Sequence, residues 1–391
     1  MPPTTRRVLL ALLALHGGAA LAALPPPAPG VPPAFQDNGP PLPAVRVAVL
    51  PVRNISGQVT APVRELQAAL EQALAARGIP LLERPVLDDV MARLRVRYVG
   101  GVDRETALGF WTEATTNAVL VTTLDLYEPA DPPQVGLHAR LAAVDGEELR
   151  LLWADSWTGA GDDHPGLLDM RLVHDPALLV ARAVEQLADG LAAFLHGERP
   201  AAPAPRAPGF RERFAPRSLH VQERGGAAAP EVRRVAVLPP VNESGRRDAG
   251  EIVQLQLVRE LVRMGGVDVI EPGQVRRMLL DTRTIAEGGG VSLTQTELVH
   301  DILGVDMVIA GRVSEYQQAA PGGVPAVEFT VYGIDSRLRQ VTWMARSHGS
   351  GRPRLGFFGS GEVRSVHALA AELARGLVAA LVRRHALGAG G

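Results

Sequence analysis

Two stretches of this chain carry polar side chains at a spacing that suits ligand binding. Each follows an apolar run and has the pattern Asn-x-Ser-Gly: Asn54, Ser56 and Gly57, and again Asn242, Ser244 and Gly245. In an open α/β sheet, ligands bind beyond the carboxyl ends of the strands, and the N-terminus of the following helix attracts anions. The pattern therefore predicts a site for a small anionic or glycan ligand at each turn.

The same residues also suit a structural turn. Asn and Ser side chains hydrogen-bond to nearby backbone, and Gly adopts positive φ without strain. Neither stretch belongs to a glycine-rich phosphate-binding fingerprint, and the chain contains no Lys that could reach a phosphate. We favour the turn and keep ligand binding as the first alternative.

Asp162, Asp163 and His164 bring three metal-ligand types together on an expected loop. A metal-dependent hydrolase centred on them is the second alternative, but adjacent residues commonly point in different directions, so we favour a solvated loop. The sequence has no H-E-x-x-H zinc motif and no G-x-S-x-G nucleophile elbow. We expect no enzyme, no catalytic residue, no metal and no cofactor.

Phe357 and Phe358 are adjacent and flanked by glycines in a second expected loop. Exposed apolar side chains usually mark contacts. We predict that this loop touches the other domain or a partner protein; folding back onto its own domain is the alternative.

The elements that position these residues occur twice. VRVAVLPVRNISG (45–57) returns as RRVAVLPPVNESG (233–245), and His174 and His367 each precede a closing helix, as Glu83 and Glu271 each precede an earlier one. Segments 45–57 and 233–245 begin 233 − 45 = 188 residues apart. A period of this length indicates two copies of one domain rather than a solenoid. The predicted organisation is a signal peptide (1–24), a Pro-rich tether (25–43), a first repeat (44–196), a Pro/Ala/Arg linker (197–231) and a second repeat (232–387).

Each repeat predicts the order β-α-β-α-α-β-β-β-α. In the first repeat the second strand is expected at 79–83, and a hairpin at 135–144 and 148–153. Crossover helices make strands parallel, and the hairpin adds antiparallel pairs. The fold class is therefore α/β, with two tandem repeats of a three-layer α/β domain around a mixed sheet.

Composition excludes several functions. The formal charge is −2, so charge gives no reason to expect nucleic-acid binding. The absence of Lys excludes P-loop, Schiff-base and protein-kinase lysines, and the absence of Cys excludes disulfides, thiolate chemistry and N-terminal lipidation. The sequence therefore indicates binding rather than catalysis.

The N-terminus predicts export. Arg6 and Arg7 precede the apolar run VLLALLAL, and ALA at 20–22 fits a signal-peptidase site. The export route is Sec, with a twin-arginine signal as the alternative. We expect no membrane span after signal removal, because charged residues interrupt the apolar C-terminal helix.

VAVLP with the Asn-x-Ser-Gly turn, LER at 82–84 and GVDMVIAGRVSEY at 304–316 resemble the α/β domain shared by the TolB N-terminal region and the CsgG-like curli assembly and transport family. The resemblance implies a non-enzymatic bacterial envelope protein. Two features depart from that family: there is no Cys to lipidate, and the connections at 128–134 and 317–325 are too short for membrane hairpins. A pore is therefore not expected.

The predicted function is that of a periplasmic adaptor, scaffold or assembly factor that works through protein–protein contacts. Its expected partners are envelope proteins, with self-association included, and its expected location is the periplasm, associated with the outer membrane.

Overall fold

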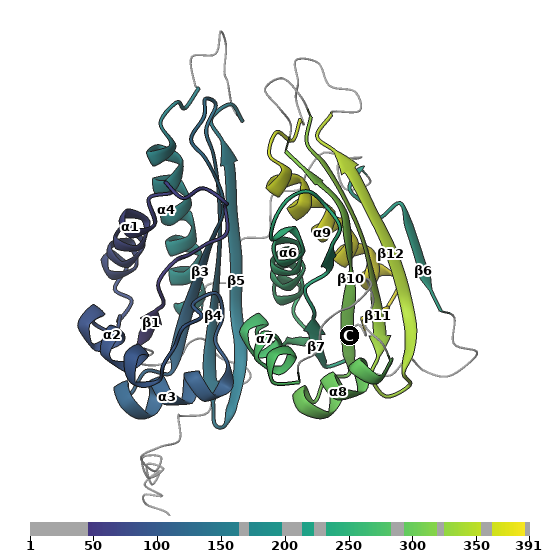
Figure 1. The fold of residues 1–391 in the computed structure, drawn as a ribbon, viewed down its shortest axis with the longest axis horizontal. Helices are drawn as coiled ribbons and strands as arrows, with labels where there is room; N and C mark the ends of the chain where they lie inside the picture. Colours follow the sequence, from purple (N-terminus) through teal and green to yellow (C-terminus); the bar gives the residue numbers. More distant parts are fainter. Residues whose placement is uncertain are drawn as a thin grey trace, which may run out of the picture.

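Helices and sheets alternate across the molecule (Figure 1). Helices α1 (Val63–Ala76) and α4 (Pro176–Leu195) lie outside the first sheet, while α6 (Ala249–Met264) and α9 (Val366–Arg383) lie between the first sheet and the second. The computed structural model describes residues 46–163, 172–197, 213–222, 232–282, 293–318, 324–352 and 362–387. The predicted α/β class with two mixed sheets is confirmed.

The first domain contains a sheet in the order β1-β3-β4-β5, with β2 also paired to β3. β1 and β2 run parallel to β3, and the β3–β4 and β4–β5 pairs are antiparallel. Its remaining elements are β1 (Val47–Val49), β2 (Arg53–Asn54), α2 (Arg84–Arg93), α3 (Arg104–Ala114), β3 (Ala118–Glu128), β4 (Gln134–Asp145) and β5 (Glu148–Ala160).

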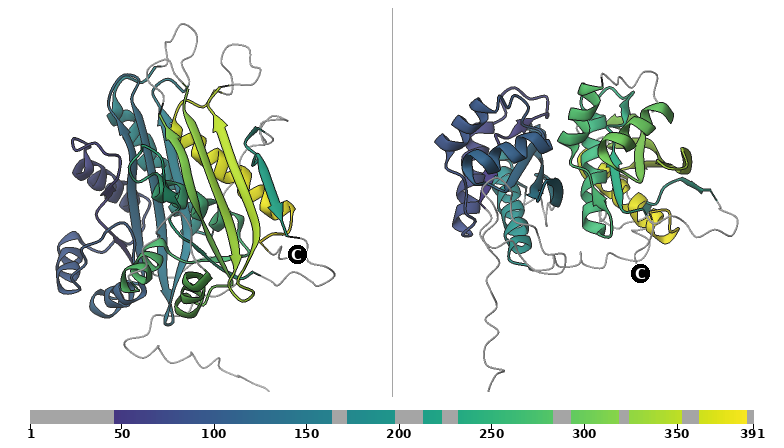
Figure 2. Two further views of the ribbon diagram at one scale, coloured as in Figure 1. Left: turned by 45° about the vertical axis from the view of Figure 1, so that its right-hand side comes forward. Right: turned by 90° about the horizontal axis from the view of Figure 1, so that it is seen from below.

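The second domain repeats this arrangement and adds an edge strand, giving the order β6-β12-β11-β10-β7-β9, with β8 paired to β10. Its remaining elements are β6 (Ser218–Val221), β7 (Arg234–Val237), β8 (Val241–Asn242), β9 (Asp268–Val269), α7 (Pro272–Asp281), α8 (Leu293–Leu303), β10 (Met307–Gln317), β11 (Ala326–Asp335) and β12 (Gln340–Ser350). The two views of Figure 2 show the domains side by side.

Alternate residues of β3 enter different hydrophobic cores. Leu120 packs with residues of α1 and α4, whereas Val119 and Val121 pack with residues of α2 and α3. Successive side chains of a strand point to opposite faces of the sheet. One face of the first sheet is therefore covered by α1 and α4, and part of the other face by α2 and α3.

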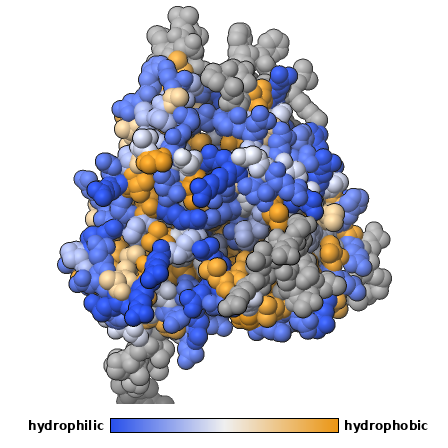
Figure 3. Space-filling view, in the orientation of Figure 1, coloured by the Kyte–Doolittle hydropathy of each residue, from blue (hydrophilic) through white to orange (hydrophobic). Residues whose placement is uncertain are grey.

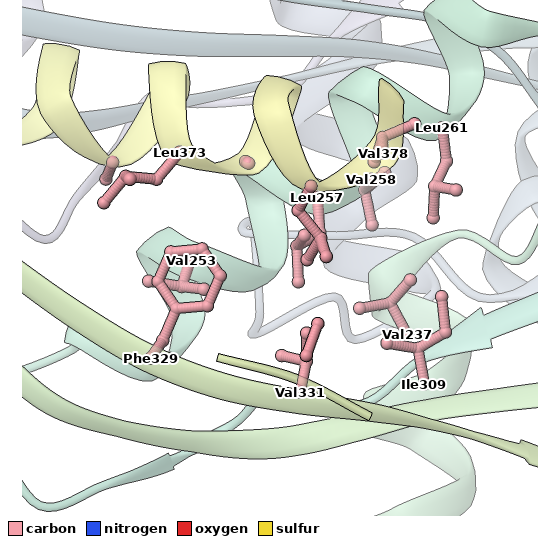
Figure 4. Packing of buried hydrophobic residues seen from close by; sticks show 14 of the residues in the cluster. Val237, Val253, Leu257, Val258, Leu261, Ile309, Phe329, Val331, Leu373 and Val378 are labelled. Atoms are coloured by element: carbon pink, nitrogen blue, oxygen red, sulfur yellow. The ribbon is translucent and has the colours of Figure 1, made fainter. Parts of the chain in front are cut away.

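Helix α1 forms because Leu66, Leu70 and Leu74 recur on one face and are all buried. Each fully buried leucine contributes about 1.5–3 kcal/mol. The chain leaves the helix through Gly78, whose φ of 74° is costly for other residues. The equivalent helix of the second domain, α6, packs Val253, Leu257 and Leu261 against its own sheet and α9 (Figure 4).

Three details differ from the sequence prediction. The strand expected at 79–83 is reduced to one bridge between Leu81 and Val47, since Pro80 has no N–H to donate to a ladder. The strand expected at 148–153 continues to Ala160. The range predicted as a linker contains β6, which pairs with β12, and Phe214, which is buried in the core of the second domain.

Candidate functional site

The two Asn-x-Ser-Gly stretches form the same turn. Asn54 Oδ1 accepts hydrogen bonds from the backbone N and the hydroxyl of Ser56, at 2.9 and 2.7 Å, and Asn54 Nδ2 donates to the Gln58 carbonyl. Gly57 has a φ of 84°. These side-chain contacts hold the backbone after β2.

In the second domain, Asn242 accepts from the backbone N and hydroxyl of Ser244 at 3.0 and 2.6 Å, and donates to the Arg246 carbonyl. The surroundings of the two turns differ, since Ser56 is 3% exposed whereas Ser244 and Gly245 border an open pocket of about 430 Å3. Ligand binding at the turns stays a prediction.

The second domain packs against the free part of the first sheet, and we call this contact the junction. Helix α6 lies along β5, and Leu151 and Ile55 of the first domain join the hydrophobic core of the second. Every residue of α6 from 252 to 261 is buried, whereas α1 is buried on one side only. Thus α6 has a sheet on each side.

Asp125 is the centre of a buried polar cluster at the junction. His138 Nδ1 lies 2.6 Å from Asp125 Oδ2. From the second domain, His367 Nε2 and Arg246 Nη2 donate to the Asp125 carbonyl oxygen at 3.0 and 2.9 Å. The Tyr316 ring meets His367 edge-on at 5.4 Å. The second domain therefore docks directly on the backbone of β3.

Burial controls the protonation of this cluster. It lowers the pKa of His367 to about 4, so the imidazole is neutral near pH 7. Burial raises the pKa of Asp125, but the opposing effect of His138 and His367 is larger and holds that pKa below its ordinary value. Burial also raises the pKa of the Tyr316 phenol. The Asp125, His138 and His367 side chains are at most 2% exposed; the Asp125–His138 pair lies within the first domain, and the bonds that cross the junction reach the Asp125 carbonyl oxygen.

A buried ion pair crosses the junction below this cluster. Arg140 Nη2 lies 3.1 Å from Glu271 Oε1, and both side chains are at most 2% exposed. Arg140 also donates to the Gly100 carbonyl at 2.9 Å, while Glu271 accepts from the backbone N of Gly273 at the start of α7. Burial raises the pKa of Glu271 against the opposing effect of Arg140.

The backbones of the two domains touch beside this ion pair. A Cβ atom on Gly273 would lie 2.3 Å from the Val102 nitrogen, and one on Gly101 would lie 2.6 Å from the Gly273 Cα. Glycine is therefore needed on both sides for the close approach.

Further ion pairs surround the junction and join one domain to the other. They include Arg53 with Glu251, Arg259 and Arg263 with Asp155, and Arg364 with Asp162. In the last pair, Arg364 Nη1 lies 2.5 Å from Asp162 Oδ2. Asp162, one of the predicted metal ligands, is therefore bound to an arginine. Among the described residues there is no group of three or more potential metal ligands.

The other predicted residues have separate places. His164, Phe357 and Phe358 lie outside the described residues, as do the signal peptide and the tether. Repeated backbone hydrogen bonds, from the Val173 nitrogen to the Gly161 carbonyl and from the Val363 nitrogen to the Gly351 carbonyl, align His174 with Arg364. The equivalence of His174 and His367 expected from the sequence is therefore wrong: His174 precedes α4, is exposed and lies 2.9 Å from Asp131, whereas His367 lies in the first turn of α9.

The second sheet has a face equivalent to the one buried at the junction, and we call it the open sheet face. On it, Arg312, Met344 and Arg346 are exposed, Thr330 is half-buried, and Tyr332 is half-buried against the core under α7 and α8. Strand pairing makes Thr330 and Tyr332 equivalent to His138 and Arg140. Met344 is 45% exposed, and Arg346 pairs with Glu328 across the face.

Sequence reasoning missed Asp125, His138 and Arg140. Their signal is a polar residue at every second position of an otherwise apolar strand, which indicates one face that packs on something other than a hydrophobic core. Gly136 is a second signal, because a Cβ atom there would lie 2.6 Å from Asp125 Oδ1.

No helix among the described residues has the length and apolar character needed to cross a bilayer. On the face that Figure 3 shows, hydrophilic residues predominate and hydrophobic ones form separate patches.

Comparison with known proteins gives weak structural matches. A PelC dodecamer from Paraburkholderia phytofirmans is 21% identical, with 41% of this chain and 95% of that chain covered and a TM-score of 0.27. Lipoprotein GNA1162 from Neisseria meningitidis is 19% identical over 38% of this chain and 99% of that chain, with a TM-score of 0.28. The C-terminal domain of LpoB from Salmonella enterica is 12% identical over 32% and 85%, with a TM-score of 0.23. No family model and no curated protein matches the sequence.

Proposed function

We propose that this chain is an exported, non-enzymatic envelope protein that acts as a scaffold through protein–protein contacts. The signal-like N-terminus supports export, and the resemblance to the TolB and CsgG-like domains supports an envelope location and an adaptor role. The buried, mutually paired polar groups of the junction support binding rather than catalysis.

One observation carries the proposal: within the chain, one copy of the domain already binds the other. The bound surfaces are the sheet face of the first domain and the helical face of the second, which is a heterologous contact. Such a contact leaves one surface of each kind that the other described domain does not cover. Here these are the open sheet face and the outer side of α1, which is exposed at Arg64, Ala68 and Gln72.

The proposed occupant of the open sheet face is therefore a second copy of this chain, docking through its α1. Gln67 accepts a hydrogen bond from the Val52 nitrogen just after β1, and Gln254 donates one to the Val237 carbonyl at the end of β7; we align α1 with α6 at these two glutamines. In this alignment Arg64, Gln72 and Ala76 replace Glu251, Arg259 and Arg263 of the junction. The contact between copies lacks these ion pairs, so we expect it to be weaker than the junction and reversible.

Sedimentation velocity of the mature chain over a wide range of concentrations tests this association. We expect the average mass to rise with concentration. Met344→Glu places a charge at the centre of the open sheet face and should weaken association by at least about tenfold. Val382→Glu, at a half-exposed position of α9 away from that face, is the matched control and should behave like the wild type.

A wild-type chain that stays monomeric at every concentration contradicts self-association. If Met344→Glu then abolishes capture of a different envelope protein, the face binds another partner and the second-copy assignment is wrong.

A small-ligand function has one observation in its favour, the open pocket beside Ser244 and Arg246. Under this alternative, Ser244→Ala should abolish stabilisation by an anionic ligand such as inorganic phosphate without unfolding the protein. Unchanged stabilisation in Ser244→Ala would dismiss it.

A further inference from the structure

A second pocket lies where the two domains meet, at the end of the junction occupied by α3 and α7. It has a volume of about 380 Å3, within the range of small-ligand sites. Its walls come from the segment 94–106 of the first domain and from α7 of the second. It therefore exists only while the domains are packed together.

Arginines dominate the charge of this pocket. Arg95, Arg97, Arg276 and Arg277 line it, against two carboxylates, Asp103 and Glu105. We call it the arginine pocket. Four positive and two negative side chains leave a formal charge of 4 − 2 = +2.

The carboxylates leave most of the arginines without an ion pair. Arg277 is bound by Asp281 at 2.8 Å and lies 3.9 Å from Glu105. Asp103 caps α3, where it accepts from the Thr106 nitrogen at 2.9 Å. Within the described part of the chain, no carboxylate lies within ion-pair distance of the other three arginines.

The floor of the pocket is rigid. The guanidinium carbons of Arg276 and Arg53 lie 4.1 and 5.0 Å from the centre of the Tyr98 ring. The Gly101–Gly273 backbone contact and the Arg140–Glu271 ion pair hold the walls in place beside it. Because these contacts fix the walls, little ordering is needed when a ligand binds.

Guanidinium groups bind phosphate through paired hydrogen bonds. The apolar side chains of Leu94, Val96 and Leu280 complete the lining, which suits a carbon skeleton attached to the anion. We propose that the arginine pocket binds a phosphate ester and that the bound anion links the two domains. The ester comes either from a soluble metabolite or from a lipid headgroup, which share this chemistry.

Isothermal titration of the full chain with glucose 1-phosphate and with pyrophosphate tests the proposal. We expect binding to the wild type, with an affinity at least about tenfold lower in the double variant Arg97→Gln/Arg276→Gln. The matched control is Arg182→Gln/Arg383→Gln, which removes two exposed arginines from α4 and α9, neither of which lines the pocket, and should bind like the wild type.

Arg95→Gly separates binding from folding. Arg95 has a φ of 54°, a left-handed conformation that glycine adopts without strain. This variant should keep or raise the unfolding temperature while it weakens phosphate binding severalfold. Equal loss of binding in the Arg182/Arg383 control, or unchanged binding in Arg95→Gly and the double variant, would overturn the assignment.

Flotation with vesicles of phosphatidylcholine containing phosphatidic acid distinguishes the two sources. Vesicle binding that pyrophosphate competes away, and that the double variant lacks, assigns the pocket to a lipid phosphate. Binding of glucose 1-phosphate without vesicle binding assigns it to a soluble ester. The absence of both contradicts the proposal.

Discussion

At the scale of single residues, the Arg140–Glu271 pair makes the sharpest energetic prediction. Removing one partner of a buried ion pair leaves the other charge unpaired, which costs about 3–5 kcal/mol. Arg140→Met should therefore lower the free energy of unfolding by about that amount. Adding Glu271→Gln should restore much of it, because no uncompensated charge then remains. Urea unfolding of the wild type, both single variants and the double variant gives the four free energies of this double-mutant cycle.

A single Arg140→Met variant within about 1 kcal/mol of the wild type would show that the pair does not hold the junction. Additive losses in the double variant would show that the two side chains act independently.

Gly273→Ala tests the backbone contact between the domains. The new Cβ would lie 2.3 Å from the Val102 nitrogen, so one domain must move. We expect a loss of about 1–3 kcal/mol in the free energy of unfolding. Gly245→Ala is the control, because its Cβ meets nothing within 4 Å, and it should be neutral or slightly stabilising. Equal effects at the two positions would contradict the close contact.

The residues of the site were only partly predictable. The turn chemistry of Asn54 and Asn242 follows from local sequence, because their hydrogen-bond partners lie within four residues. By contrast, His367 bonds to Asp125 and Arg140 bonds to Glu271 from the other domain, more than a hundred residues away. Local patterns contain no information on such partners.

At the scale of elements, the docking of the α9 N-terminus on β3 makes stability depend on pH. The folded pKa of His367, about 4, is below the ordinary value of 6.5. Between these values the unfolded chain binds more protons, so stability rises with pH and falls on acidification. From pH 7 to pH 5 this histidine should cost about 2 kcal/mol. The pKa of Asp125 is also lowered, so Asp125 adds to the loss of stability only at pH values below this range.

His367→Gln should remove this part of the pH dependence, measured as the difference in urea unfolding free energy between pH 7 and pH 5. His174→Gln is the control, because it changes an exposed histidine just before α4 in the first domain and should leave the dependence intact. If the pH dependence of stability is unchanged in His367→Gln, another group causes it.

Most helices and long strands were predictable because their apolar periodicity is strong and their caps are local. For α3, Asp103 before the helix marks the start that the structure has. The edge strand β6 was missed because four half-exposed residues among Pro and Arg carry little periodic signal. Strand pairing with β12, which is distant in sequence, is what forms it.

At the scale of the whole molecule, the duplication was predictable and the packing of its copies was not. The repeat of VAVLP and the following turn is visible in the sequence. The junction is polar, and polar faces look alike whether they meet water or another domain. The covered face with His138 and Arg140 and the open one with Thr330 and Tyr332 are distinguished only by the fold.

The central claim is that the open sheet face binds the outer side of α1 of a second copy. The chain has no native cysteine, so single cysteines report specifically. We would mix purified Ala68→Cys and Met344→Cys chains and measure disulfide-linked dimers under mild oxidation. The account predicts that the mixed pair forms dimers faster than either variant alone and faster than Ala68→Cys mixed with Val382→Cys. Equal rates in all mixtures would contradict it.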